Sequence, residues 1–529
     1  MSRFSSDARR RLWALALLAA LLLAQAAYRR LHAPLPAAGT AGATAAAATR
    51  APQPGAPERL RMGRLTLRPC LIGGRLADGL ASIAAYCASF PVPEDWAAVG
   101  GRRIDLHVAV VRAESDTPAP DLVTFLDGGP GGAATEDYPA IAGALEPLRE
   151  RHDILLVDQR GTGGSNPLDC PQLPQRRPSP AVADEPQVVA QQLRACLAQL
   201  STHAAPQFYT TTDAVRDLEA VRRALGAAPL DVIGVSYGTR VAQQYARRYP
   251  AAVRSVVLDS PVPNSVALGN DHAVNLERAL RLQFALCRAN AACKARFGDP
   301  YATLIELRDR LRAHPVGVDL RDPQSFQPLH LTLTADDLAT VVRFYAYDPL
   351  TAALLPLVLH EAQQGNYAPL LGQRTLLAND LGDQITSGEE LSVICAEDVD
   401  LLTPRAAADD TLLGNEVITR EQAACRVWPH GSRPANFHAA WQSAVPVLVL
   451  DGELDPVTPP AYGSEIVQQL SDARQLIAPG QGHSVIGAGC MPRLVQRFVE
   501  TLDPKGLDAG CLAHLGAVPA FLDYNGAGP

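Results

Sequence analysis

Lysine is almost absent from this sequence: Lys294 and Lys505 stand against 45 arginines. No stretch gathers basic residues as a nucleic-acid-binding surface would, and the net charge of the 529 residues is −8, so we expect no nucleic-acid partner. Charged residues make up only 19% of the chain and apolar residues 47%, which is typical of a globular protein with a large core. A chain of this length is expected to hold about two structural units.

Motifs for metal, redox and phosphate chemistry are also missing. No C-x-x-C pair occurs, which argues against a zinc ribbon or a thioredoxin-type site. The segment at 360–364 begins His-Glu but has glutamine where H-E-x-x-H needs its second histidine. The glycine-rich loop at 128–132 is not followed by Gly-Lys-Ser/Thr, so a phosphate-binding P-loop is rejected. We therefore expect neither a metal nor a cofactor.

The N-terminus accounts for part of the apolar content. Three arginines at 9–11 precede an apolar run at 12–27 that ends in small residues. This order predicts a secretory signal peptide in residues 1–27. Arginines at 29–30 could instead stop transfer, so the alternative is an uncleaved N-terminal anchor, which would be the protein's attachment to a membrane. Either way we expect an exported protein, periplasmic or secreted.

The ten cysteines fit an exported chain, because an even number in an oxidising compartment indicates disulfides. Along the chain, the cysteines lie in five groups of two, with longer gaps between the groups than within them. This spacing favours bonds between neighbours, such as Cys170 with Cys196 and Cys395 with Cys425, although the sequence alone does not fix the pairing.

The order of apolar segments predicts how the chain is divided. Residues 28–60, rich in alanine and proline, are expected to be a flexible linker. In residues 61–263, short apolar strands alternate with helical segments, which predicts a parallel sheet covered on both faces. The periodicity of residues 264–444 is mainly helical, and we interpret this part as an inserted lid. Strands resume in residues 445–529, so both ends of the chain are expected to build one sheet.

A strand-like run at 230–235 leads into Gly234-Val235-Ser236-Tyr237-Gly238 and then into a helix-like segment. Strand, sharp turn and helix in this order form a nucleophile elbow, in which glycines relieve crowding and expose the serine hydroxyl. Five such residues can also occur by chance. The prediction therefore depends on finding a base for Ser236 and an acid that orients the base.

Both partners occupy the expected places, each in a loop after a late strand. Asp455 follows the strand that ends near Leu450, and His483 follows the strand that ends near Ala478. Asp451 and Glu453 lie in the same loop as Asp455, but Asp455 is deeper in it and is restrained by the following proline. The sequence thus predicts a triad of Ser236, Asp455 and His483.

Five motifs in chain order resemble one known group of enzymes. They are Gly-Gly-Pro-Gly, Asp-Gln-Arg-Gly-Thr-Gly-x-Ser, Gly-x-Ser-x-Gly, Asp-Pro-x-Thr-Pro and Gly-His, at 128–131, 158–165, 234–238, 455–459 and 482–483. The sequence resembles the proline iminopeptidase family of α/β-hydrolase serine peptidases and, more closely, its secreted tripeptidyl aminopeptidase branch. Asp127 departs from proline iminopeptidases, which usually have histidine there.

The resemblance implies an α/β-hydrolase fold: a mostly parallel central sheet with helices on both faces and an inserted, mainly helical lid. It also implies a serine exopeptidase that cleaves peptides from a free N-terminus, as a tripeptidyl- or prolyl-type aminopeptidase, through an acyl-enzyme. Ser236 would be the nucleophile, Asp455 the orienting acid and His483 the base. The backbone N–H groups of Gly129 and Tyr237 would bind the oxyanion.

Other residues receive supporting roles. The resemblance implies that Asp158 and Arg160 are structural supports near the site. An exopeptidase must bind an α-ammonium group, which a carboxylate of the lid would do through charge-assisted hydrogen bonds. The segment at 392–398 offers Glu397 and Asp398 for this task, and Glu389 and Glu390 compete with them.

Two other functions remain open on the same residues. An esterase or other acyl hydrolase of small molecules could use the same scaffold, because this fold hosts many chemistries. A non-catalytic binding protein is the second alternative, against which the full set of serine, aspartate and histidine argues. The oligomeric state is not indicated by the sequence.

Overall fold

The computed structural model describes residues 58–73, 82–170, 186–323 and 325–527. The expected signal peptide or anchor, and all but the last residues of the linker, lie outside these ranges. Among the described residues, the helices are all too short or too polar to cross a membrane.

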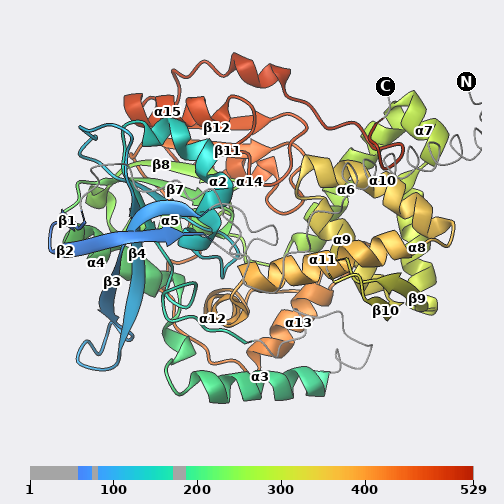
Figure 1. Ribbon diagram of the computed structural model, residues 1–529, viewed down its shortest axis with the longest axis horizontal. Coiled ribbons are helices and arrows are strands. Elements are labelled where there is room, and N and C mark those ends of the chain that lie inside the picture. Colours follow the sequence, from blue (N-terminus) through green and yellow to red (C-terminus); the bar gives the residue numbers. More distant parts are fainter. Residues whose placement is uncertain (1–57, 74–81, 171–185, 324, 528–529) are drawn as a thin grey trace, which may run out of the picture. The chain divides into compact units, whose positions relative to one another are not determined.

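The described residues form one mixed ten-stranded sheet with the strand order β1-β2-β3-β4-β6-β5-β7-β8-β11-β12 (Figure 1). Strands β6, β5, β7, β8, β11 and β12 run parallel to their neighbours, while β1 to β4 add an antiparallel edge that joins β6 through β4. The strands of the sheet are β1 Leu60–Met62, β2 Leu65–Ile72, β3 Ile83–Pro93, β4 Arg103–Val111, β5 Val123–Leu126, β6 Ile154–Val157, β7 Leu230–Val235, β8 Val253–Asp259, β11 Val447–Gly452 and β12 Ala473–Ala478.

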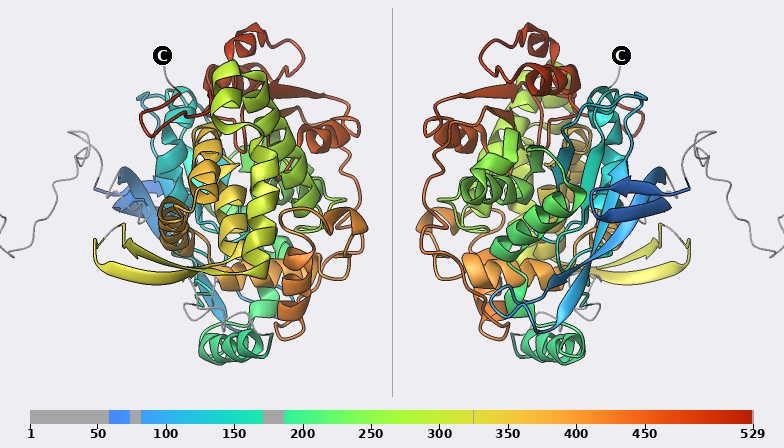
Figure 2. Two further views of the ribbon diagram at one scale, coloured as in Figure 1. Left: turned by 90° about the vertical axis from the view of Figure 1, so that its right-hand side faces the viewer. Right: turned by 90° about the vertical axis from the view of Figure 1, so that its left-hand side faces the viewer.

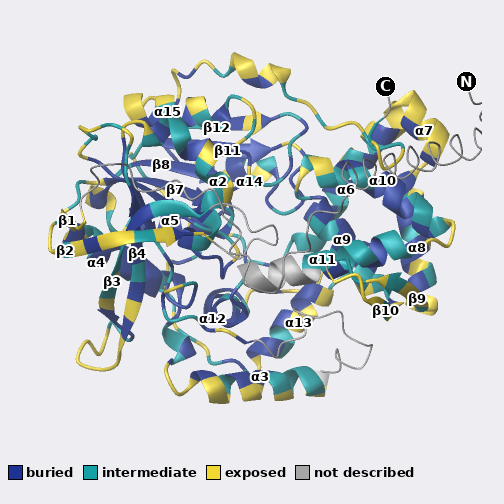
Figure 3. Cartoon of the chain, viewed as in Figure 1, coloured by how far each residue is buried: buried dark blue, intermediate teal, exposed yellow. Residues whose placement is uncertain are grey.

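Helices cover both faces of the parallel part, as the sequence predicts. Within β7, Val232 packs with one core cluster and its neighbour Ile233 packs with the other, because successive side chains of a strand point to opposite faces. All six residues of β7 are buried, as Figure 3 shows for the central strands. One face is covered by α4 Thr211–Leu225, α5 Tyr237–Arg248 and α14 Pro460–Val467, and the other by α2 Ala134–Arg149 and α15 Met491–Thr501. The helix α3 Pro186–Leu200 lies farther from the sheet and packs against α13 Glu416–Cys425 (Figure 1).

The helix α4 illustrates how local sequence sets an element's limits. Thr210, in extended conformation, caps the helix by accepting a hydrogen bond from the N–H of Asp213. Asp213 lies in the first turn, near the positive end of the helix dipole. Gly226 ends the helix in the left-handed conformation, with φ of 65°, which glycine adopts readily.

The residues between β8 and β11 form an insertion, and most of its helices share a core cluster of their own. Most of it is helical, as expected, but residues 316–333 form an antiparallel hairpin that the helical periodicity did not indicate. Figure 2 shows this hairpin in yellow, extending beyond the helices. Its elements are α6 His272–Ala289, α7 Ala291–Phe297, α8 Pro300–Ala313, β9 Val316–Arg321, β10 Pro328–Leu333, α9 Ala335–Tyr345, α10 Pro349–Gln363, α11 Ala368–Gln384, α12 Ser387–Glu397 and α13 Glu416–Cys425.

Five disulfides join the cysteines in successive pairs, and the described part of the chain holds no free cysteine. The expected bonds Cys170–Cys196 and Cys395–Cys425 are both present. The other three are Cys70–Cys87, Cys287–Cys293 and Cys490–Cys511.

Candidate active site

Ser236 lies in a sharp turn between β7 and α5, at the carboxyl end of a central strand. Its φ of 55° is unusual for a residue with a side chain and marks local backbone strain. The two flanking glycines are needed for space. A Cβ on Gly234 would lie 2.4 Å from the carbonyl oxygen of Gly238, and one on Gly238 would lie 2.1 Å from that of Leu126. The turn therefore has the geometry of a nucleophile elbow.

Asp455 and His483, predicted from loops far apart in sequence, are in direct contact. Nδ1 of His483 lies 2.8 Å from Oδ2 of Asp455, whose side chain is fully buried. The other carboxylate oxygen accepts hydrogen bonds from the N–H groups of Val457 and Thr458. A carboxylate only accepts, so Nδ1 carries the proton and Nε2 is left as the basic nitrogen.

The charges of this pair support each other. Burial by itself would raise the pKa of Asp455, but the imidazole of His483 and the two backbone N–H groups outweigh it and hold that pKa below its usual value. Burial would lower the pKa of His483, yet the carboxylate of Asp455 keeps that pKa above 6.5. The histidine is thus ready to hold a proton taken from a neighbouring hydroxyl.

Two residues at the end of β8 hold the histidine loop, and no motif in the sequence indicates them. Asp259 is fully buried and accepts hydrogen bonds from the hydroxyl of Ser484 and the N–H groups of Val485 and Ile486. Ser260 accepts the N–H of Ser484. The carbonyl of Asp259 also accepts the N–H of Ser236, so the same residue joins the elbow to the histidine loop.

The glycine-rich loop after β5 lies beside the serine. A Cβ on Gly128 would come within 3.1 Å of Cβ and 3.7 Å of Oγ of Ser236. Gly129 and Gly131 have φ of 105° and 108°, values that favour glycine. The insertion touches this loop directly, because the N–H of Thr386 donates to the carbonyl of Gly131 at 3.0 Å.

Tyr237 is the first residue of α5, where backbone N–H groups have no partner within the helix. Its side chain points into the protein, and its hydroxyl lies 2.6 Å from that of Thr211 and accepts a hydrogen bond from Gln159. These contacts fix the start of α5, and with it the direction of the N–H that follows Ser236.

Asp158 and Arg160 are buried in structural contacts, in keeping with the support roles implied by the resemblance. Asp158 accepts hydrogen bonds from the backbone and hydroxyl of Thr135 and from the N–H of Gly164, and it pairs with His107. Arg160 donates two hydrogen bonds to Asp217 and others to backbone carbonyls.

Glu397 and Asp398, expected to bind a substrate amine, already have intramolecular partners. Glu397 accepts hydrogen bonds from the backbone and hydroxyl of Thr211 at the start of α4. Asp398 pairs with Arg240 at 2.8 Å, and both side chains are inaccessible to solvent. Burial raises the pKa of Glu397 to about 8, with a further rise from Asp398 that Arg240 partly offsets.

Glu389, the competing candidate on α12, has a free oxygen. Its Oε1 accepts a hydrogen bond from Gln159, which also donates to Tyr237, whereas its Oε2 is buried without a hydrogen-bond partner. Burial, together with the nearby Glu397 and Glu390, raises its pKa well above the usual value. Glu390 is only half-buried, and its burial and the neighbouring Glu421 raise its pKa to about 7.

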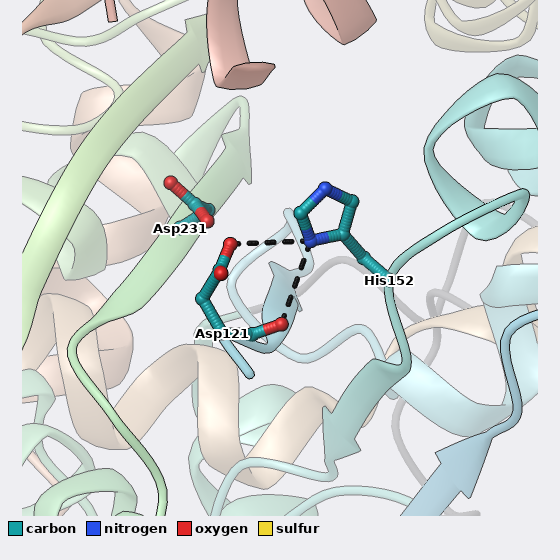
Figure 4. Close-up of side chains that lie close together, drawn as sticks. All are labelled: Asp121, His152 and Asp231. Atoms are coloured by element: carbon teal, nitrogen blue, oxygen red, sulfur yellow. Dashed lines mark hydrogen bonds and ion pairs between the residues drawn. The ribbon is translucent and has the colours of Figure 1, made fainter. Parts of the chain in front are cut away.

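A second cluster, of Asp121, His152 and Asp231, has side chains of the kinds that bind metals (Figure 4). It lies at the amino ends of β5, β6 and β7, opposite the edge that carries Ser236. Arg254 donates to Asp231 at 2.8 Å and lies 3.4 Å from Asp121. The guanidinium of Arg254 therefore supplies a positive charge beside these carboxylates, and the donor set does not fit a metal centre.

The sheet order, the elbow and the Asp455–His483 pair agree with a family comparison. The model of the α/β hydrolase fold matches residues 121–487. The chain belongs to the α/β hydrolase family. This family supports the coarse assignment of a hydrolase, and the curated relatives indicate a peptidase.

Three of these relatives differ in their identity to this chain and in how much of it they cover. The putative hydrolase YuaR of Escherichia coli is 25% identical over 440 residues, which are 78% of this chain and 85% of that protein. The serine protease Hip1 of Mycobacterium tuberculosis is 25% identical over 468 residues, covering 80% and 86%. The tripeptidyl aminopeptidase of Streptomyces lividans is 30% identical over 191 residues, covering 33% and 35%.

Proposed function

We propose that this α/β hydrolase is an exported serine exopeptidase that cleaves peptides from a free N-terminus, with Ser236, Asp455 and His483 as its catalytic triad. The observation that carries the proposal is the 2.8 Å contact between His483 and the buried Asp455 at the sheet edge where the elbow presents Ser236. Relatives named as a serine protease and a tripeptidyl aminopeptidase support the choice of peptide substrates.

In the proposed reaction, Oγ of Ser236 attacks the scissile carbonyl carbon while Nε2 of His483 takes its proton. Asp455 keeps the imidazole in the required tautomer and stabilises its charged form. The N–H groups of Gly129 and Tyr237 bind the oxyanion. His483 then donates the proton to the leaving amine, and the acyl-enzyme on Ser236 is hydrolysed by water that the same histidine activates.

The α-ammonium group needs a carboxylate, and α12 supplies it in this proposal. Among the described residues, no basic side chain forms an ion pair with Glu389, and its Oε2 lacks a hydrogen-bond partner. It is favoured over Asp398, which pairs with Arg240 and lies 3.7 Å from His438, and over Glu397, both of whose oxygens hold Thr211. Through Gln159, Glu389 is linked to Tyr237, the residue next to the nucleophile. Because burial raises the pKa of Glu389 well above its usual value, binding of an ammonium group would release a proton from this carboxyl and give the buried carboxylate its charged partner.

The insertion acts as a lid in this proposal. Thr386 contacts the glycine-rich loop and Tyr347 contacts the histidine loop, so the insertion spans the edge of the sheet that carries the triad. The five disulfides and the basic-then-apolar N-terminus support export.

The proposal is tested with three substrates that share one acyl residue: a peptide amide with a free N-terminus, its N-acetylated form and a simple ester. We expect cleavage of the free-amine peptide and a large loss of kcat/KM on acetylation. Ester hydrolysis with no cleavage of the free-amine peptide would favour the esterase alternative instead.

A further inference from the structure

The lid makes a direct contact with the proposed catalytic histidine. Tyr347 lies between α9 and α10, and its carbonyl oxygen accepts the backbone N–H of His483 at 2.7 Å. The ring of Tyr347 packs edge-on against the imidazole, with 5.1 Å between ring centroids. One lid residue thus holds both the backbone and the ring of His483.

The contact between Tyr347 and the histidine loop leaves no room for a side chain at position 482, which is glycine. A Cβ at Gly482 would lie 2.0 Å from the carbonyl oxygen of Tyr347, far inside van der Waals contact. On its other side, the carbonyl of Gly482 would lie 1.8 Å from a Cβ placed on Gly452 at the end of β11. The residue before His483 is therefore held between the sheet and the lid, and only glycine fits there.

Tyr347 is itself held in place from several directions. Arg343 interacts with its hydroxyl, and Phe344 stacks on its ring at 5.6 Å. Asp348, the next residue, caps α10 through the N–H groups of its first turn. These contacts give the tyrosine one position relative to α9 and α10.

The C-terminal segment, residues 516–527, joins the same parts of the molecule. Gln481 in the histidine loop donates to the carbonyl of Gly516, and Phe521 donates its N–H to the carbonyl of Ala353 on α10. Phe521 and its neighbours pack against Phe297 and Leu357 of the lid. Figure 1 shows this segment in red, running from the core to α10 and α7.

From these contacts we propose that Tyr347 is a positioning residue, which fixes the orientation of His483 and makes the activity of the triad depend on the lid being in place. The proposal rests on the proposed function of His483 as general base. The ring of Tyr347 excludes water from one side of the imidazole, and its carbonyl fixes the loop. A small displacement of a catalytic group lowers the rate by as much as ~10²-fold, so this support matters for kcat.

The groups that face His483 set the direction of a pH effect. Asp455 and Asp259 favour the protonated imidazole, and burial opposes it. Burial lowers the pKa of the nearby His272 on α6 to about 3, so that side chain is neutral. Arg278, also on α6, interacts electrostatically with the carboxylate of Asp455. Removing the Tyr347 ring lets water reach the imidazole and reduces the burial effect. The pKa of His483 then rises, and the acid limb of the kcat/KM profile moves to higher pH.

The test compares Tyr347→Ala, Tyr347→Leu and Tyr347→Phe with Tyr301→Ala, which removes a lid tyrosine that packs on Arg281 instead. In the alanine and leucine variants we expect kcat to fall by about 10-fold or more with KM changed by less than about 3-fold. The acid limb should move up in both. Tyr347→Phe keeps the ring, so it should retain more of kcat and the wild-type acid limb, and Tyr301→Ala should match the wild type.

A second readout does not depend on turnover: the low-field proton NMR signal of the His483 Nδ1–H, followed against pH. Its apparent pKa should rise in Tyr347→Ala and Tyr347→Leu only. Wild-type kcat, acid limb and signal in both of these folded variants would overturn the inference while leaving the triad intact. If the wild type cleaves neither peptide nor ester, the proposed function fails, and the NMR titration still decides the role of Tyr347.

Discussion

At the scale of single residues, three carboxyl groups lie at the end of β11 and in the loop after it, and their surroundings separate them. Asp455 contacts His483, whereas Glu453 is exposed and accepts the N–H of Gly480. Asp451 is buried against Gln475, and burial raises its pKa well above the usual value. A carboxyl group that tends to stay protonated cannot stabilise an imidazolium well, so the geometry and the charge both select Asp455.

Substitution of Asp455 should therefore impair catalysis, whereas substitution of the neighbouring Glu453 should not. We expect Asp455→Asn to lower kcat on the order of 10³–10⁴-fold, because the amide no longer holds His483 in the reactive tautomer. Glu453→Gln is the matched control in the same loop and should keep wild-type kcat. Steady-state kinetics on the free-amine peptide measure both, and equal losses in the two variants would contradict the assignment.

The pKa of His483 predicts the acid side of the activity profile. The histidine acts as a base only when neutral, and Asp455 keeps its pKa above 6.5 despite burial. Activity should therefore fall as the pH drops through a value higher than 6.5. The pH dependence of kcat/KM reports this pKa in the free enzyme, and an acid limb well below 6.5 would contradict the pairing.

At the scale of elements, α12 brings acidic side chains to the region behind the elbow. If Glu389 binds the substrate amine, Glu389→Gln should raise KM for the free-amine peptide by about 10-fold or more, the range expected for losing a charge-assisted hydrogen bond. The N-acetylated peptide should be affected much less. Kinetic constants for both peptides give the comparison.

The variants Glu397→Gln and Asp398→Asn decide between the candidates on α12. They should alter stability more than KM, because their partners are Thr211 and Arg240. A selective rise in KM for the free-amine peptide in either variant, with Glu389→Gln unchanged, would return the amine site to the pair that the sequence suggested.

The elements also show what the sequence could predict. Strands with clear apolar runs, such as β4, β5 and β6, can be recognised in the sequence, and so can the helical period of α9 at Ala335–Tyr345. The helix α2 cannot, because Pro139 and Pro147 lie inside it and mask its periodicity. The helix α3 follows a proline-rich stretch, and the exposed hairpin strands β9 and β10 carry only a weak alternation.

The residues of the candidate site also differ in how far the sequence alone indicates them. Ser236, Asp455 and His483 could be named because each follows its own strand in a fixed chain order. Asp259, Ser260 and Tyr347 could not, since their contacts with the histidine loop arise only when distant segments come together. The sequence also does not rank the acids of α12, because the partners of Glu397 and Asp398 lie more than a hundred residues away.

At the scale of the whole molecule, several buried carboxyl groups keep protons that the unfolded chain would release. Burial raises the pKa of Glu397 to about 8, and those of Glu390 and Asp231 to about 7. Between about pH 5 and 8 the folded state therefore binds more protons than the unfolded state. Stability is fully present below the unfolded pKa values and falls as pH rises, by about 1.4 kcal/mol per pH unit for each such proton.

We expect the urea midpoint of the disulfide-intact protein to fall from pH 5 to pH 8. Asp231→Asn, at the sheet edge opposite the proposed triad, should make this dependence shallower because one titrating group is removed. Unfolding curves followed by circular dichroism at three pH values measure the trend. A midpoint that rises with pH over this range would show that these carboxyls are ionised in the folded state.

The central claim is that Ser236 is a nucleophile activated by His483 and Asp455. Its most direct measurement is reaction of the folded protein with a fluorophosphonate, followed by mass spectrometry of the peptides. The account predicts one adduct, on Ser236, whose formation slows strongly in a His483→Gln variant. An unlabelled protein, or an adduct on another residue with Ser236 unmodified, would contradict it.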